Sequence, residues 1–224
     1  MSDMQNSLPT DPHAQTPVLL AGEPLASARA TLVMVHGRGA SAEDILSLAD
    51  VLDVAGFALL VPQAAGFQWY PYPFTAPTEQ NEPYLSSALA KVGSMLAQVA
   101  DAGIPPERTV LLGFSQGACL SLEYVARNAR RYGGVAGLSG ALIGPDGAPR
   151  DYPGSLASTP VFLGCSDMDP HIPATRVRES ASVLEKLGAQ MTMRLYPGLG
   201  HTVSRDEADE VNKLLAAVRG SKVW

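Results

Sequence analysis

Residues 109–117 read TVLLGFSQG, so a short apolar run leads directly into the pattern Gly-x-Ser-x-Gly. This pattern is typical of a nucleophile elbow, a sharp turn from a strand into a helix that exposes a serine hydroxyl above a sheet. The flanking glycines, Gly113 and Gly117, place no Cβ atom in the way of so tight a turn. The segment therefore predicts an α/β sheet that carries Ser115 as a nucleophile at the carboxyl end of a strand.

An alternation of strand-like and helix-like segments extends over the rest of the chain. The other short apolar runs are at 30–35, 57–61, 135–138, 160–163 and 191–196. Apolar residues at helical spacing lie between or after them, at 45–52, 85–99, 120–125, 177–187 and 214–218. Several runs are continuous rather than alternating, as in strands that are buried on both faces of a parallel sheet. We therefore expect a three-layer α/β fold with a mostly parallel central sheet.

The domain organisation is expected to be simple. Residues 1–16 are polar and interrupted by proline, and we expect them to form a flexible N-terminal tail. After them we find no linker, low-complexity segment or repeat. Residues 17–224 are therefore expected to form a single domain.

Composition restricts the classes of partner and compartment. Hydrophobic residues make up 46% of the chain and charged residues 17%, which is typical of a folded domain with a sizeable core. The net charge of −6 argues against nucleic acid or an anionic membrane as a partner, and we expect no stable membrane association. The N-terminus lacks the features of a secretion signal, and two cysteines, Cys119 and Cys165, make no disulfide framework. We expect a cytoplasmic protein.

A serine nucleophile requires a base, and the chain offers four histidines. His13 lies in the expected tail, His36 lies beside a glycine turn, and His171 precedes an Ile-Pro step. His201 ends the segment PGLGH directly after the last strand-like run, so it follows the serine in sequence and lies on a carboxyl-end loop. We interpret His201 as the base and His36 as a structural partner in its turn.

The base must be oriented by a carboxylate, and two aspartates compete for this role. The loop after the run at 160–163 contains both Asp167 and Asp169, and spacing alone does not separate them. The sequence Asp-x-Asp-x-His, which ends at His171, is also compatible with a metal site. Pro170 interrupts any regular strand there and no second histidine cluster exists, so we expect no metal.

The developing oxyanion requires two N–H donors. We expect one to be the backbone N–H of Gln116 at the start of its helix, and the other to be the backbone N–H of Arg38 in the early loop HGRG. In that role the side-chain charge of Arg38 would be incidental. The same loop also begins G-x-G-x-x-A, a dinucleotide fingerprint, so an oxidoreductase is the alternative from another class. The next strand ends at Gln63 without the acid that a ribose would need, which argues against it.

Five aromatic residues fall within 67–74, after the run at 57–61. We expect this cluster to line the rim of the site, with Trp69 and Tyr70 as substrate-binding residues. Rigid aromatic faces interleaved with proline suit an apolar acyl or aryl group.

Taken in order, the motifs HGRG at residue 36, GFSQG, DPHIP at residue 169 and GH at residue 200 resemble the bacterial phospholipase/carboxylesterase family, which includes the acyl-protein thioesterases. The resemblance covers residues 30–220. It implies a compact α/β-hydrolase without a large cap domain and without a cofactor. It also implies that the orienting acid is the one before proline, Asp169.

The resemblance implies a carboxylesterase that cleaves small-molecule esters, with short-chain or aryl esters as the expected substrates. An acyl-protein thioesterase or a lysophospholipase is the alternative within the same class. The thioesterases typically carry Leu and Asp where this chain has Arg38 and Ala40, and their short Trp-Phe/Tyr-Asp patch is replaced here by WYPYPF at 69–74.

Overall fold

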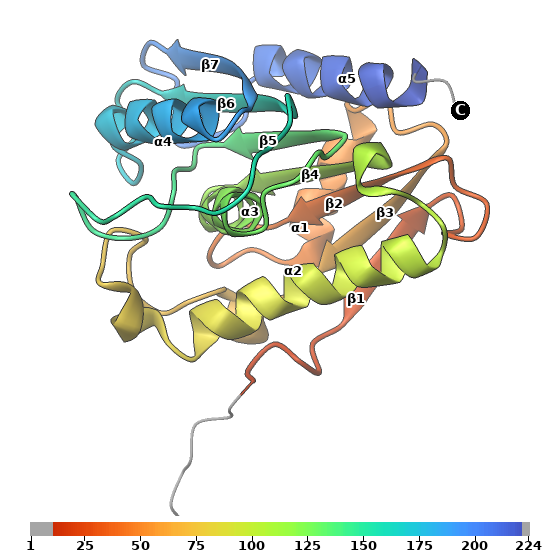
Figure 1. The fold of residues 1–224 in the computed structure, drawn as a ribbon, viewed down its shortest axis with the longest axis horizontal. Helices are drawn as coiled ribbons and strands as arrows, with labels where there is room; N and C mark the ends of the chain where they lie inside the picture. Colours follow the sequence, from red (N-terminus) through yellow and green to blue (C-terminus); the bar gives the residue numbers. More distant parts are fainter. Residues whose placement is uncertain (1–10, 221–224) are drawn as a thin grey trace, which may run out of the picture.

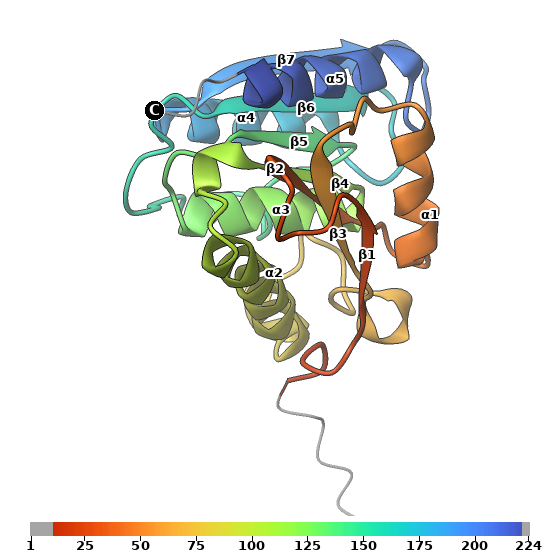
Figure 2. The ribbon, with the colours of Figure 1, turned by 90° about the vertical axis from the view of Figure 1, so that its right-hand side faces the viewer.

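The computed structural model of the chain describes residues 11–220, and its core is a seven-stranded sheet with helices on both faces (Figures 1 and 2). The strands are β1 (Val18–Gly22), β2 (Ala30–Val35), β3 (Phe57–Pro62), β4 (Thr109–Phe114), β5 (Gly134–Leu138), β6 (Pro160–Ser166) and β7 (Gln190–Tyr196). The α-helices are α1 (Ala42–Leu46), α2 (Tyr84–Asp101), α3 (Gln116–Arg127), α4 (Ala174–Lys186) and α5 (Arg205–Gly220). Short 3₁₀ segments lie at Ser47–Asp50, Ala65–Phe67, Thr78–Asn81 and Pro106–Arg108.

The sheet has the order β1-β3-β2-β4-β5-β6-β7. All neighbouring strands pair in parallel except β1, which runs antiparallel to β3 at one edge. Every residue of β2, β3 and β5 is buried, as expected for continuous apolar strands that are covered on both faces. The predicted three-layer α/β fold with a mostly parallel sheet is therefore confirmed.

Alternate side chains of each central strand enter different cores. Val33 points into the larger core, which is covered by α2, α3 and α4. Its neighbour Leu32 points into the second core, which is covered by α1 and α5. This division follows from the strand period of two residues. The longest connections within residues 11–220 are 63–83 and 139–159, and neither contains an α-helix.

Residues 11–16 pack against the domain, so the predicted tail is wrong over this range. The side chain of His13 is fully buried. Its Nε2 donates to the carbonyl oxygen of Trp69 at 3.0 Å, and its Nδ1 accepts from the backbone N–H of Ala65 at 3.0 Å. The backbone N–H of His13 donates to Ser87 Oγ at 2.8 Å. These partners are distant in sequence, so the polar composition of the segment gave no sign of them. The expectation for residues 1–10 lies outside the described residues.

None of the helices between residues 11 and 220 is both long and apolar enough to cross a membrane.

Candidate active site

Ser115 sits in the turn between β4 and α3, with φ 55° and ψ −120°. This conformation is rare for a residue with a side chain and is costly unless the surroundings enforce it. Gly113 and Gly117 make it possible. A Cβ atom on Gly113 would lie 2.3 Å from the carbonyl oxygen of Gly117, and one on Gly117 would lie 2.1 Å from that of Val35. The glycines therefore allow α3 to pack directly on the ends of β4 and β2, which leaves Ser115 half-buried at the carboxyl edge.

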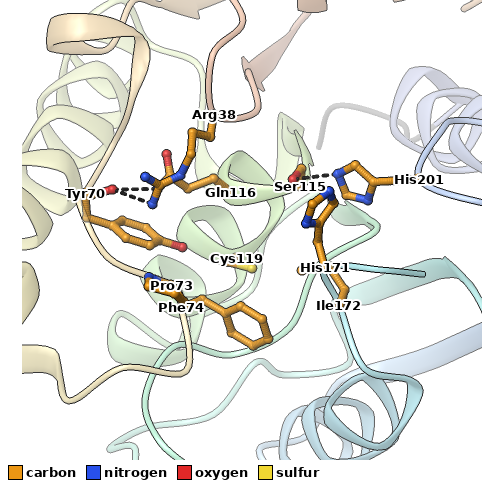
Figure 3. Close-up of a pocket in the computed structure, with 10 residues that line it drawn as sticks. All are labelled: Arg38, Tyr70, Pro73, Phe74, Ser115, Gln116, Cys119, His171, Ile172 and His201. Carbon is orange, nitrogen blue, oxygen red and sulfur yellow. Dashed lines mark hydrogen bonds between the residues drawn. The ribbon is translucent and has the colours of Figure 1, made fainter. Parts of the chain in front are cut away.

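Three loops at this edge of the sheet bring Ser115, His201 and Asp169 into one hydrogen-bonded chain. His201 Nε2 lies 2.9 Å from Ser115 Oγ (Figure 3). Its Nδ1 lies 2.7 Å from Asp169 Oδ2. Since a carboxylate accepts, the Nδ1 atom carries the proton and Nε2 is free to accept the serine proton.

The carboxylate of Asp169 is inaccessible to solvent and is held from both of its oxygens. Its Oδ1 accepts from the backbone N–H groups of His171 at 2.8 Å and Ile172 at 3.0 Å. Burial disfavours the ionised form, but the hydrogen bonds from His201, His171 and Ile172 outweigh it and lower the pKa of Asp169. The group is thus an anion aimed at the imidazole.

Asp167 has a different partner. Its Oδ1 accepts from the backbone N–H of Gly198 at 2.9 Å, in the loop that leads to His201. Ser166 Oγ accepts from the N–H of Gly200 in the same loop at 3.1 Å. Asp167 therefore holds the histidine loop and does not contact the imidazole.

Within residues 11–220, no group of three or more His, Cys, Asp or Glu side chains is arranged to hold a metal ion.

The backbone N–H groups of Arg38 and Gln116 have no hydrogen-bond partner among the described residues. The loop of Arg38 lies against the nucleophile, because a Cβ atom on Gly37 would be 3.3 Å from Ser115 Cβ. Gln116 is the first residue of α3, so its N–H adds to the positive end of the helix. The glycine at position 37 belongs to the G-x-G-x-x-A pattern, and its close approach to Ser115 gives that pattern a role other than binding a dinucleotide.

The side chain of Arg38 is not incidental, which corrects the sequence-based expectation. Its guanidinium donates four hydrogen bonds to the segment 68–72. The acceptors are Gln68 Oε1 (3.0 Å) and the carbonyl oxygens of Tyr70 (2.9 Å), Pro71 (2.8 Å) and Tyr72 (3.0 Å). Gln116 binds the same segment, because its Nε2 donates to the Tyr70 carbonyl and its Oε1 accepts from the N–H of Trp69, both at 2.8 Å. The two candidate oxyanion residues thus fix the neighbouring wall with their side chains.

The expectation that Trp69 binds substrate is wrong. Its side chain is fully buried, and its Nε1 donates to the carbonyl oxygen of His36 at 2.8 Å. A large aromatic ring with a satisfied N–H is well suited to a core, and nothing in the sequence separated it from its exposed neighbours Phe67 and Tyr72. His36 is buried beside it and accepts from the N–H of Ala64 with its Nε2 at 3.0 Å, which fits the structural role expected for this histidine.

Ser115 and His201 open into a cavity of about 380 Å³. Figure 3 shows its walls, which come from several loops and from α3. The other lining residues are Arg38, Tyr70, Pro73, Phe74, Gln116, Cys119, His171 and Ile172. Tyr70, Pro73 and Phe74 belong to the segment 67–74 that we expected at the rim of the site, whereas no role was expected for Ile172. The His171 ring meets that of His201 edge-on, with 4.8 Å between their centroids.

The mostly parallel sheet and the strained Ser115 turn define the α/β-hydrolase fold. The chain belongs to the phospholipase/carboxylesterase family, whose sequence model matches residues 21–219. The crystal structure of a phospholipase/carboxylesterase from Dyadobacter fermentans is 46% identical, with a TM-score of 0.87, and the match covers 90% of this chain and 96% of that one. The family comprises carboxylesterases and thioesterases, so the chain belongs to a family of hydrolases that act on esters or thioesters.

Acyl-protein thioesterases are among the similar sequences. The one from Emericella nidulans is 28% identical over 217 residues, which are 84% of this chain and 90% of that protein. The one from Gibberella zeae is 36% identical over 131 residues, which span only 53% of its length. The structure of SOBER1 from Arabidopsis thaliana has a TM-score of 0.73 at 22% identity, which shows likeness of fold.

Proposed function

We propose that the protein is a serine carboxylesterase that cleaves short-chain or aryl esters through an acyl-enzyme on Ser115. The observation that carries this proposal is the hydrogen-bonded order Ser115–His201–Asp169 beside a largely apolar cavity. Acyl transfer requires a nucleophile, a base, an anion that orients the base, and donors for the oxyanion. The roles proposed here provide each of these groups.

In the first half of the reaction, Ser115 Oγ attacks the acyl carbon and its proton passes to His201 Nε2. The carbonyl oxygen becomes an oxyanion that accepts hydrogen bonds from the backbone N–H groups of Arg38 and Gln116. Asp169 stabilises the imidazolium through Nδ1. The tetrahedral adduct then collapses, the bond to the alcohol oxygen breaks, and Nε2 returns the proton to that oxygen.

In the second half, a water molecule takes the place of the alcohol. It gives a proton to His201 Nε2 as its oxygen attacks the acyl carbon, and the second adduct collapses to release the carboxylic acid. The proton returns to Ser115 Oγ. One ester and one water thus give one acid and one alcohol, and the enzyme is regenerated.

The cavity supports the preference for short or aryl acyl groups. Phe74 and Ile172 line it with rigid or branched apolar groups, and the hydrogen bonds from Arg38 hold the segment 68–72 in place. Such walls favour a compact acyl group over a long flexible one. Thioester or lysophospholipid cleavage at the same residues is the second candidate function, which the similarity to acyl-protein thioesterases supports.

Intact mass analysis after treatment with a fluorophosphonate tests the mechanism without a choice of substrate. We expect one phosphonyl adduct, mapped to Ser115 and absent from Ser115→Ala. Ser94→Ala, at an exposed position on α2, is the matched control and should label like the native protein. Equal labelling of Ser115→Ala would overturn the proposal. A p-nitrophenyl ester series then separates the two candidates, because a marked preference for sixteen-carbon chains would favour the thioesterase.

A further inference from the structure

The hydroxyl of Tyr70 is a polar group on the cavity wall that the proposed reaction does not use. The backbone of Tyr70 is held firmly, since its carbonyl oxygen accepts from both Arg38 and Gln116. Tyr70 is 1% exposed, and within residues 11–220 its hydroxyl has no nitrogen or oxygen partner at hydrogen-bond distance. Figure 3 shows the hydroxyl end of the ring directed toward Cys119, which also lines the cavity.

Cys119 does not meet the needs of this hydroxyl. Its thiol is near enough for an electrostatic interaction and a hydrogen bond with the Tyr70 hydroxyl, but sulfur is a weak hydrogen-bonding group, so this bond is weak. The Sγ atom already accepts from the N–H of Ala141 at 3.4 Å. Burial also raises the pKa of Cys119 to about 11, so the group is a neutral thiol rather than a strongly accepting thiolate.

A buried hydroxyl without a strong partner costs free energy, and such groups in native proteins call for a reason. A bound ligand that accepts the hydrogen bond removes this cost. A ligand of the same shape without an acceptor leaves the hydroxyl unpaired, which is how a polar group in a pocket discriminates between substrates.

The chemistry around Tyr70 selects the kind of ligand atom. Burial raises the pKa of Tyr70 well above its usual range, so the hydroxyl is a neutral donor and its partner is an acceptor. Two arginines are near the cavity, but both are engaged. Arg38 binds the segment 68–72, and Arg176 pairs with Asp146 at 3.0 Å and Glu179 at 3.1 Å. The terminal amino groups of Arg38 are directed at the segment 68–72, and Arg176 is paired with carboxylates, so a carboxylate beside the Tyr70 hydroxyl would have no arginine fork to bind, and a neutral oxygen fits better.

The position of Tyr70 indicates which part of the ester carries that oxygen. The leaving alcohol must lie within reach of His201 Nε2, because that atom returns its proton. Tyr70 and Cys119 line the cavity across from His201 (Figure 3). The acyl group occupies that end when the alcohol lies beside the imidazole.

We propose that Tyr70 determines acyl specificity by donating a hydrogen bond to a neutral ether, carbonyl or hydroxyl oxygen on the acyl group. This inference rests on the proposed esterase function. The preferred substrates are then esters of oxygenated carboxylic acids, rather than esters of plain hydrocarbon acids of the same length.

Pairs of p-nitrophenyl esters test this proposal. Each pair joins pentanoate, hexanoate or heptanoate to the methyl-ether analogue in which an oxygen replaces one methylene at the distal end. We expect kcat/KM for at least one ether to exceed that of its hydrocarbon partner by about tenfold, after correction by the rates of alkaline hydrolysis. Tyr70→Phe should abolish this preference, whereas Tyr72→Phe, at an exposed tyrosine two residues away, should retain it.

The outcomes separate the inference from the function on which it rests. The wild-type protein could hydrolyse p-nitrophenyl acetate and still show the same ether preference as alkaline hydrolysis. This result would overturn the role of Tyr70, and its measurement needs no variant. An ether preference that persists in Tyr70→Phe would overturn it as well. Failure to hydrolyse any ester, together with failure to react with a fluorophosphonate, would overturn the proposed function itself.

Discussion

Asp167 and Asp169 lie two residues apart on one loop, yet their carboxylates have different partners. Asp169 binds the imidazole of His201 at 2.7 Å, whereas Asp167 binds the N–H of Gly198 at 2.9 Å. Pro170 restricts the conformation of Asp169 before it, and the N–H groups of His171 and Ile172 fix its second oxygen. The two residues therefore support His201 in separate ways, through its ring and through its loop.

Exchange of each aspartate for asparagine distinguishes these two kinds of support. Asp169→Asn keeps the shape but favours the wrong histidine tautomer, so we expect kcat to fall on the order of 10⁴-fold, as in serine proteases. Asp167→Asn retains an acceptor oxygen for Gly198 and should keep at least about a tenth of the native rate. Steady-state kinetics with p-nitrophenyl acetate, beside circular dichroism to verify folding, measures both. The reverse ranking in folded variants would make Asp167 the orienting acid.

At this scale, the sequence could single out Ser115 and His201 because each belongs to a motif with a demanding backbone. It could not decide between the two aspartates without a resemblance, since the decision depends on how the loop turns after β6. It also could not separate Trp69 from Tyr70. Both are aromatic and adjacent, and which ring enters the core is decided by partners far along the chain, such as the His36 carbonyl.

Among the elements, the connection 63–83 between β3 and α2 depends most on contacts from other parts of the chain. It forms one wall of the cavity through Tyr70, Pro73 and Phe74. Arg38 holds it with a planar, always charged fork that matches several carbonyl oxygens at once. A leucine at this position, as in the acyl-protein thioesterases, could make none of these bonds.

We therefore expect Arg38→Leu to damage the cavity wall while the domain remains folded. The backbone N–H of residue 38 is kept, so the loss reports on the side chain. Misplacement of the wall should lower kcat/KM for short esters by about 10- to 100-fold. Limited proteolysis should show faster cleavage within 67–73.

Arg131→Leu is the matched control for this variant. Arg131 also donates to two carbonyl oxygens of a loop, those of Ala157 and Ser158, but these residues do not line the cavity. Its kcat/KM should equal that of the native protein. Native kinetics in Arg38→Leu would mean that the segment 68–72 holds its conformation without the guanidinium.

For the whole molecule, the sequence sufficed where burial is continuous. The strands β2 to β6 are mostly apolar, so their runs were visible, and the alternation with helices predicted the three-layer fold. Strand β1 at the edge was not predicted, although residues 18–21 are apolar, and in the structure it lies partly exposed, with Leu20 60% exposed. Residues 11–16 were missed for a related reason, since their attachment depends on polar contacts rather than on an apolar pattern.

Those polar contacts connect the stability of the molecule to pH. At the start of the cavity wall, the backbone N–H of Ala64 donates a hydrogen bond to His36 Nε2, and that of Ala65 donates one to His13 Nδ1. The other ring nitrogens donate to the carbonyl oxygens of Gly37 and Trp69. Both bonding patterns require a neutral ring. Burial accordingly lowers the pKa of His13 and of His36 from the ordinary value of 6.5, more than the nearby carbonyls and carboxylates raise it.

The direction of the effect follows from proton binding. Below about pH 6.5 the unfolded chain protonates both histidines while the folded protein resists, so the unfolded state binds more protons. The free energy of unfolding should therefore fall as pH drops from 8 to 5.5, by at most about 1.4 kcal/mol per pH unit for each histidine. Carboxylates with a lowered pKa, such as Asp169, lose their stabilising contribution only at lower pH, where carboxyl groups become protonated. The buried Glu207 has a raised pKa and acts in the opposite direction.

His13→Gln tests this origin of the pH dependence. A glutamine amide offers one acceptor and one donor, as the neutral imidazole does, but it does not titrate. Urea denaturation at a series of pH values from 5.5 to 8 should give a shallower fall in the free energy of unfolding for the variant, whatever its stability at pH 8. The slope that remains includes the contribution of His36 and the opposite contribution of Glu207. Identical slopes in the native protein and the variant would show that His13 binds protons equally in both states, and that the segment 11–16 is not the acid-sensitive attachment of the cavity wall.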